Sequence, residues 1–232
     1  MKNVMKLTVS AVALSGGVLL AAPAMAQSGP SVSGNFALTS DYRFRGVSLS
    51  DEDVAVQGGI DLGWDSGFYL GTWGSSIASY AGSEAEVDLY TGFGGDLGNG
   101  LGYDIGVIGY FYPGSDPFGD TWYGEIYASL GGEVDMFGWT VGGAYAPDQD
   151  NIGGTDNVYL FADASVGLGD SPFSLDGHFG WEDGAFGDDK LDWSLGISAS
   201  AAGLDFGLAW IDTDVQAETA DSTFVFTIGS SW

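Results

Sequence analysis

Two arginines separated by one residue, Arg43 and Arg45, are the most distinctive charged groups in an otherwise acidic chain. Residues two apart on a β-strand share a face, so both guanidinium groups would point the same way. Inside a closed barrel they would meet carboxylates such as Asp41 and Asp61 and form a charged constriction that filters solutes. The alternative is a structural ion-pair network that plugs a narrow lumen. The sequence leaves both interpretations open.

Nine carboxylates are predicted to face this lumen, because each alternates with outward apolar residues along its expected strand. With two arginines opposite them, they predict an interior that favours cations. The alternative is that several are protonated or held in hydrogen-bond networks. The nine predicted lumen acids are Asp41, Asp61, Asp88, Asp104, Glu125, Asp163, Asp176, Asp192 and Asp205.

The single histidine, His178, shares its expected strand face with Asp176, an arrangement that would suit a catalytic pair. A hydrolase also needs a placed nucleophile or an activated water, and the chain has no Gly-x-Ser-x-Gly motif and no metal-spaced histidine pair. The 40 glycines form no complete nucleotide-binding motif. We therefore predict no enzyme, no catalytic residue and no cofactor, and interpret His178 as a lumen or rim residue.

Three acidic clusters could in principle bind Ca²⁺, at residues 51–53, 148–156 and 188–189. None completes an EF-hand loop. We predict no metal site and interpret the clusters as a solvated acidic surface.

Residues 1–26 have the pattern of a cleaved secretory signal peptide. Lys2 and Lys6 precede an apolar run, and Ala24 and Ala26 supply a small-residue cleavage site. No later stretch approaches the ~18 consecutive apolar residues of a spanning helix. If residues 27–232 form one domain that crosses a membrane, they must cross it as strands. Without the signal, three basic residues face 32 acidic ones, a net charge of −29, which argues against nucleic acid as a partner.

Alternating apolar residues recur in twelve segments of roughly ten residues, which predict a transmembrane antiparallel up-and-down β-barrel. Short turns alternate with longer connections, as periplasmic turns and outer loops do in such barrels. Eighteen acids lie in or beside the longer connections, five in the short turns and nine in the lumen, so none of the 32 faces lipid. The expected strands span residues 32–44, 54–64, 68–76, 85–93, 101–111, 122–130, 137–145, 158–168, 173–181, 191–197, 204–210 and 222–232.

The last expected strand alternates with particular regularity: Phe226, Ile228 and Trp232 share one face. We predict that it closes the barrel against the first strand, which leaves no open edge. In the first strand, Tyr42 is expected to face outward, at an aromatic rim.

Five stretches carry a family resemblance: SDYRFRGVS at residues 40–48, QGGID at 57–61, GFYLGTW at 67–73, EVDLYTG at 86–92 and GYFYPG at 109–114. In them the chain is similar to the TorF-like family of proteobacterial outer-membrane porins. Beyond Leu130 the resemblance rests mainly on alternation and on Trp232. It implies an outer-membrane, channel-like protein and supplies no catalytic residues. A final aromatic is also typical of the assembly signal of outer-membrane barrels.

Together these observations predict a porin or channel of the cell outer membrane for passive diffusion of small hydrophilic solutes or ions, with a preference for cations. The alternatives are a non-conducting structural or adhesive barrel and, with little in its favour, a membrane-embedded hydrolase. The expected partners are outer-membrane lipid, the barrel-assembly machinery and small solutes or cations, with no nucleic acid.

Overall fold

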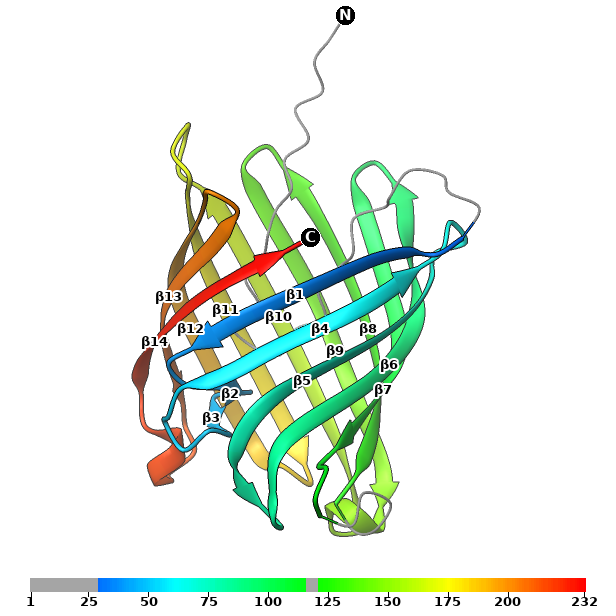
Figure 1. The fold of residues 1–232 in the computed structure, drawn as a ribbon, viewed down its shortest axis with the longest axis vertical. Coiled ribbons are helices and arrows are strands. Elements are labelled where there is room, and N and C mark those ends of the chain that lie inside the picture. The colour runs from blue at the N-terminus through cyan, green and yellow to red at the C-terminus, as the bar shows by residue number, and fades with distance from the viewer. Residues whose placement is uncertain (1–28, 116–120) are drawn as a thin grey trace, which may run out of the picture.

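The computed structural model describes residues 29–115 and 121–232, which form a closed barrel of twelve antiparallel strands (Figure 1). The predicted fold class and strand number are confirmed. The predicted signal peptide lies outside the described residues. The wall strands are β1 (Ser31–Thr39), β4 (Ala55–Gly63), β5 (Phe68–Tyr80), β6 (Ser83–Gly98), β7 (Leu101–Phe111), β8 (Tyr123–Val134), β9 (Phe137–Gln149), β10 (Thr155–Gly167), β11 (Phe173–Gly184), β12 (Gly187–Ala201), β13 (Leu204–Thr213) and β14 (Thr223–Ser231).

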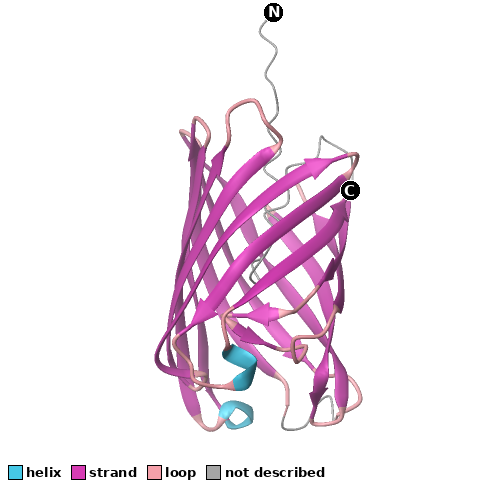
Figure 2. Ribbon diagram, turned by 90° about the vertical axis from the view of Figure 1, so that its left-hand side faces the viewer, coloured by secondary structure: helices cyan, strands magenta, loops and turns pink. Residues whose placement is uncertain are grey.

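Four short elements lie outside the barrel wall. Strands β2 (Arg43–Phe44) and β3 (Val47–Ser48) form a small hairpin of their own. The 3₁₀ helices η1 (Asp150–Ile152) and η2 (Glu218–Ala220) lie at the end of the barrel opposite the C-terminus (Figure 2). Among the described residues, no helix is long and apolar enough to cross a membrane.

The barrel closes between its first and last wall strands, as predicted. β14 pairs with β13 on one side and with β1 on the other, where Leu38 lies opposite Ile228. Gly34 and Trp232 exchange two backbone hydrogen bonds of 3.1 Å, which extend the pairing to the final residue. No wall strand therefore presents an unpaired edge.

The wall is apolar outside and largely polar inside. On β14, Phe224 and Phe226 are 69% and 48% exposed, whereas Val225 and Thr227, which alternate with them, are 2% and 5% exposed. Large apolar side chains are exposed in the same way on every wall strand. An outer face this apolar is suited to lipid and would be an aggregation hazard in water.

The phenol ends of interior tyrosines lie over glycines of the neighbouring strand. The ring of Tyr69 on β5 covers Gly92 on β6, and that of Tyr127 on β8 covers Gly106 on β7. The two tyrosine hydroxyls are hydrogen-bonded to each other, and that of Tyr69 also donates to Asp104 at 2.6 Å. Many of the glycines in this chain thus provide room for a ring inside the wall.

We expect Gly92→Ala to destabilise the barrel and Gly94→Ala, on the same face of β6, to leave its stability nearly unchanged. A Cβ at Gly92 would collide with the Ile105 carbonyl oxygen and the Tyr69 hydroxyl, whereas at Gly94 the nearest atom is a carbonyl oxygen 3.5 Å away. Overpacking of this kind costs about 1–3 kcal/mol. Urea unfolding of the two variants in detergent micelles measures the difference, and equal stabilities would contradict the steric argument.

Two sequence expectations about strand ends were wrong. The first strand ends at Thr39 and does not continue to residue 44. Two of the expected long connections are tight turns, at residues 81–82 and 185–186, because their flanking strands continue as paired hairpins. Backbone pairing does not need apolar side chains outside the membrane, so hydrophobicity underestimates strand length there.

Candidate functional site

Residues 40–54, here called the inturned segment, leave the wall and fold into the barrel (Figure 1). Thr39 pairs directly with Ala55, so the wall continues past the segment without a gap. Arg45 and Gly46 join β2 to β3 with φ values of +49° and +86°, as the two-residue turn of a tight hairpin requires. A Cβ at Gly46 would lie 2.8 Å from the Cβ of Thr213, so only glycine fits this contact with the wall.

Asp41 holds the inturned segment in shape. Its carboxylate accepts hydrogen bonds from Arg43 Nε at 2.5 Å, from the Ser48 hydroxyl at 2.6 Å and from the Ser50 hydroxyl at 3.1 Å. Asp41 was predicted to line the lumen from the first strand. It is buried in the inturned segment instead, because the chain has already left the wall.

Arg43 fastens the segment to the connection between β13 and β14. Its Nη1 atom donates to the carbonyl oxygens of Thr219 and Asp221 at 3.1 and 3.0 Å, and its Nη2 atom donates to Glu52 at 3.1 Å. The side chain is 1% exposed. The other atoms that hold Arg43, beyond η2 and the residues beside it, belong to the inturned segment itself.

Arg45 reaches the opposite way and bridges two wall strands. Its Nη2 atom lies 2.6 Å from Oε2 of Glu125 on β8, and its Nη1 atom lies 2.6 Å from Oε1 of Glu182 on β11. The guanidinium carbon is 4.6 Å from the ring centre of Phe44 and 4.3 Å from that of Tyr159. The sequence predicted both arginines inside the barrel, but on the wall rather than on a segment that crosses the lumen.

A second cation, Lys190 on β12, pairs with Glu182, which also accepts a hydrogen bond from Asn157 at 3.0 Å. Glu125 accepts from the Tyr110 hydroxyl at 3.0 Å through the oxygen that binds Arg45, while its other oxygen is buried without a partner. Only Arg43 and Arg45 were set against the lumen acids from the sequence, and the structure adds Lys190 as a third buried cation.

Tyr42 is an interior residue and not the rim aromatic that the sequence predicted. It is 4% exposed, donates to Glu86 on β6 at 2.7 Å and packs edge-on against Trp73 at 5.5 Å. Tyr112 donates to the other oxygen of Glu86 at 2.9 Å. Burial, together with the Glu86 carboxylate, raises the pKa of the Tyr42 phenol well above its usual value, so Tyr42 stays a neutral donor.

The predicted neighbours His178 and Asp176 do not form a pair. His178 contacts Asp163 through Nδ1 at 2.6 Å and Asp192 through Nε2 at 3.0 Å, and the Tyr159 hydroxyl lies 2.8 Å from Nε2. Asp176 accepts a hydrogen bond from a serine on β12. Residues two apart on one strand point the same way, but residues on adjacent strands approach more closely, and both side chains find their partners there.

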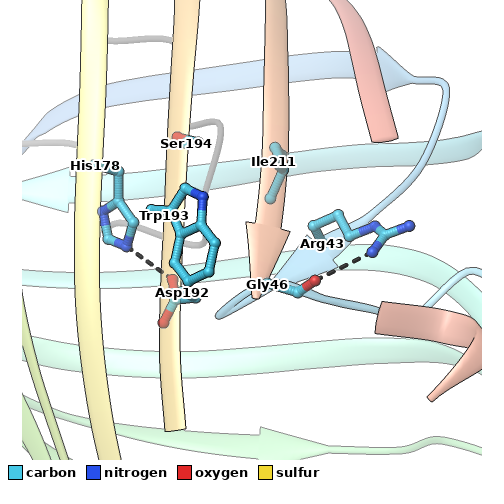
Figure 3. A pocket seen from close by; sticks show the side chains of 7 residues that line it. All are labelled: Arg43, Gly46, His178, Asp192, Trp193, Ser194 and Ile211. Carbon is cyan, nitrogen blue, oxygen red and sulfur yellow. Dashed lines mark hydrogen bonds and ion pairs between the residues drawn. The ribbon is translucent and has the colours of Figure 1, made fainter. Parts of the chain in front are cut away.

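A small cavity separates the inturned segment from the wall near His178 (Figure 3). Arg43 and Gly46 border it on the side of the segment, and His178, Asp192 and residues of β12 and β13 border it on the side of the wall. One carboxylate oxygen of Asp192 is buried without a hydrogen-bond partner.

The other predicted lumen acids lie on the inner face of the wall. Asp61 accepts a hydrogen bond from Tyr90 at 2.6 Å, and Asp205 accepts one from Ser200 at 2.5 Å. Asp88 is 5% exposed, and its Oδ1 atom has no partner.

Sequence reasoning missed three buried groups of the site, Glu86, Glu182 and Lys190, because it assigned them to connections or their edges. Strand parity could have found them, since each lies two or four residues from a predicted lumen residue: Asp88, His178 and Asp192.

Among the described residues, the buried charged groups comprise seven carboxylates and three cations. They are Asp41, Glu86, Asp88, Asp104, Glu125, Glu182 and Asp192, with Arg43, Arg45 and Lys190.

The acidic clusters do not assemble a metal site in the part of the chain that the structure describes. No group of three or more histidine, aspartate or glutamate side chains there has the geometry to hold an ion.

An apolar outer face, a polar interior and a closed antiparallel wall define the chain as a β-barrel of the outer-membrane type. The chain belongs to the family described as "Bacterial protein of unknown function (Gcw_chp)", whose model matches residues 23–232.

Solved structures of porins are similar to this chain in fold. The KdgM porin aligns with a TM-score of 0.59 and 6% identity, covering 86% of this chain and 98% of its own. The NanC porin aligns with a TM-score of 0.57 and 10% identity, covering 87% and 99%. No curated protein sequence matches the chain. At these identities the similarity concerns the fold.

Proposed function

We propose that this protein is an outer-membrane channel for passive diffusion of small hydrophilic solutes or ions, with the inturned segment as its constriction. The observation that carries the proposal is that the inturned segment contacts wall strands on several sides of the lumen. Tyr42 contacts β6, Arg45 contacts β8 and β11, and Gly46 lies against β13. A polar segment that meets so many wall strands is placed to select what passes. The similarity of the fold to solved porins supports the same proposal of a channel.

We further propose that the channel favours cations. The seven buried carboxylates outnumber the three buried cations among the described residues. An excess of one sign of charge in a narrow passage raises the local concentration of the opposite ion. The predicted lumen acids and the two arginines thereby become candidates for selectivity.

A non-conducting structural barrel is the second candidate, and one observation favours it. The side chains of Arg43 and Arg45 are 1% and 7% exposed, so in this conformation little water reaches them. A constriction this well packed would act as a plug if it never moves.

Single-channel recording of refolded protein in a planar bilayer, under a salt gradient, tests both candidates. We expect discrete current steps with a cation-selective reversal potential. Anion selectivity would keep the channel and overturn the charge argument. A protein that inserts, as shown by heat-modifiable gel mobility, yet stays silent would favour the structural barrel.

The proposal places the protein in the outer membrane after removal of its signal peptide, with lipid around the wall and solutes or cations inside. Trp232, Ile228 and Phe226 are proposed as the signal for the barrel-assembly machinery. The TorF-like assignment stays a prediction.

A further inference from the structure

The wall groups around Arg45 form a binding site that does not depend on the inturned segment for its parts. Glu125, Glu182, Tyr110 and Tyr159 belong to β8, β11, β7 and β10. The segment supplies only the guanidinium group and the Phe44 ring. If the segment moved aside, two carboxylates and an aromatic face would remain where the cation lay.

The chemistry of these wall groups matches one kind of cation closely. Two carboxylates, each 2.6 Å from a different Nη atom, satisfy the forked geometry of a guanidinium group. The Tyr159 ring, 4.3 Å from the guanidinium carbon, provides a stacking face. A compact ammonium group would use one carboxylate at a time and would not stack in this way.

The wall site is also short of positive charge. Glu125 is 3% exposed and its Oε1 atom has no hydrogen-bond partner even with Arg45 in place. Glu182 would keep Lys190 and Asn157 without Arg45, but Glu125 would keep only the Tyr110 hydroxyl. A buried carboxylate left without a cation is strongly unfavourable, which favours uptake of another cation.

We propose that the wall site formed by Glu125, Glu182, Tyr110 and Tyr159 binds small solutes that carry a monosubstituted guanidinium group, and that Arg45 is a built-in competitor for it. Such a solute must displace Arg45, so its apparent affinity falls with the fraction of molecules in which the inturned segment has released the site. The inference adds a ligand class to the proposed channel. Its test measures ligand binding and not conductance, so the proposed ligand class and the proposed channel function can each fail without the other.

The test is isothermal titration calorimetry of refolded, detergent-solubilised protein with methylguanidinium chloride. We expect Arg45→Ala to bind one equivalent saturably and at least tenfold more tightly than the unmodified protein, since Arg45 no longer competes. Methylammonium, which lacks the fork, and urea, which lacks the charge, should bind Arg45→Ala much more weakly. Adding Glu125→Gln and Glu182→Gln to Arg45→Ala should abolish the binding.

Arg43→Ala is the matched control, because its guanidinium group is held by the inturned segment and the β13–β14 connection, without wall carboxylates. Loss of Arg43 loosens the inturned segment but leaves Arg45 as a competitor, so Arg43→Ala should bind methylguanidinium at least several-fold more weakly than Arg45→Ala. Equal binding by Arg43→Ala and Arg45→Ala, or no gain in Arg45→Ala, would overturn the proposal.

Arg45→Ala could fail to fold, because Glu125 then lacks its cation. In that case Arg45→Ala and Arg45→Gln are refolded in increasing methylguanidinium, and the folded fraction is read by heat-modifiable gel mobility. We expect methylguanidinium, but not equal concentrations of sodium chloride or methylammonium, to restore folding. The absence of a difference between these salts would count against the site.

Discussion

Excision of residues 41–53, with Asn-Gly inserted between Ser40 and Val54, is expected to raise the single-channel conductance several-fold and to strengthen cation selectivity. The wall should survive, because Thr39 and Ala55 already pair directly and a two-residue insert suits a tight hairpin. The variant loses Arg43 and Arg45 but also Asp41 from the buried groups, and the exposed acids at 51–53 go with them. Among the described residues, six buried carboxylates then face Lys190 alone, where seven faced three cations before. A wider passage and a larger negative excess among the buried groups both follow.

The measurement is single-channel recording of the excised and unmodified proteins in the same bilayer and salt. An excision at the other end of the barrel, which shortens the turn at residues 168–172 to two residues, is the control, because that turn lies between β10 and β11 and far along the chain from the inturned segment. It should leave conductance unchanged. An excised protein that inserts but conducts like the unmodified one would show that the inturned segment does not limit flow.

The barrel is predictable from sequence because its rule is local. A strand between lipid and a polar lumen must alternate, and the exposed Phe224 and Phe226 beside the buried Val225 show that rule in the structure. The same parity placed Asp61, Asp104 and Asp205 on the inner face.

The path of residues 40–54 is not predictable by the same rule. Tyr42 and Phe44 continue the alternation of the first strand, so the pattern indicates a longer strand. In the structure their partners are Glu86, Trp73 and Tyr110, on strands far along the chain. In the structure the hairpin turn is made by Arg45 and Gly46, both with positive φ values. In a sequence, an Arg-Gly pair is only a weak turn signal. The contacts that place this segment, such as those of Tyr42 with Glu86 and of Arg45 with Glu125, join residues far apart in the chain, and periodicity does not report them.

The pairing of Arg45 with Glu125 should appear as a large coupling free energy between the two positions. Arg45→Met leaves Glu125 buried without a cation and should cost about 3–5 kcal/mol of unfolding free energy. Glu125→Gln leaves Arg45 with one wall carboxylate, Glu182, and should cost about 1–3 kcal/mol. In the double variant neither charge is left unpaired, since Glu182 keeps Lys190. Its cost should fall below the sum of the two by about 2–3 kcal/mol.

Urea unfolding of the four proteins in one detergent measures this coupling. Arg43→Met combined with Glu125→Gln is the control cycle, because the partners of Arg43 are Asp41, Glu52 and backbone carbonyls and do not include Glu125. Its two costs should add to within about 0.5 kcal/mol. Additive costs for Arg45 and Glu125 as well would mean that the bridge contributes little to holding the inturned segment, and the contacts of Tyr42, Arg43 and Gly46 would then hold it in the lumen.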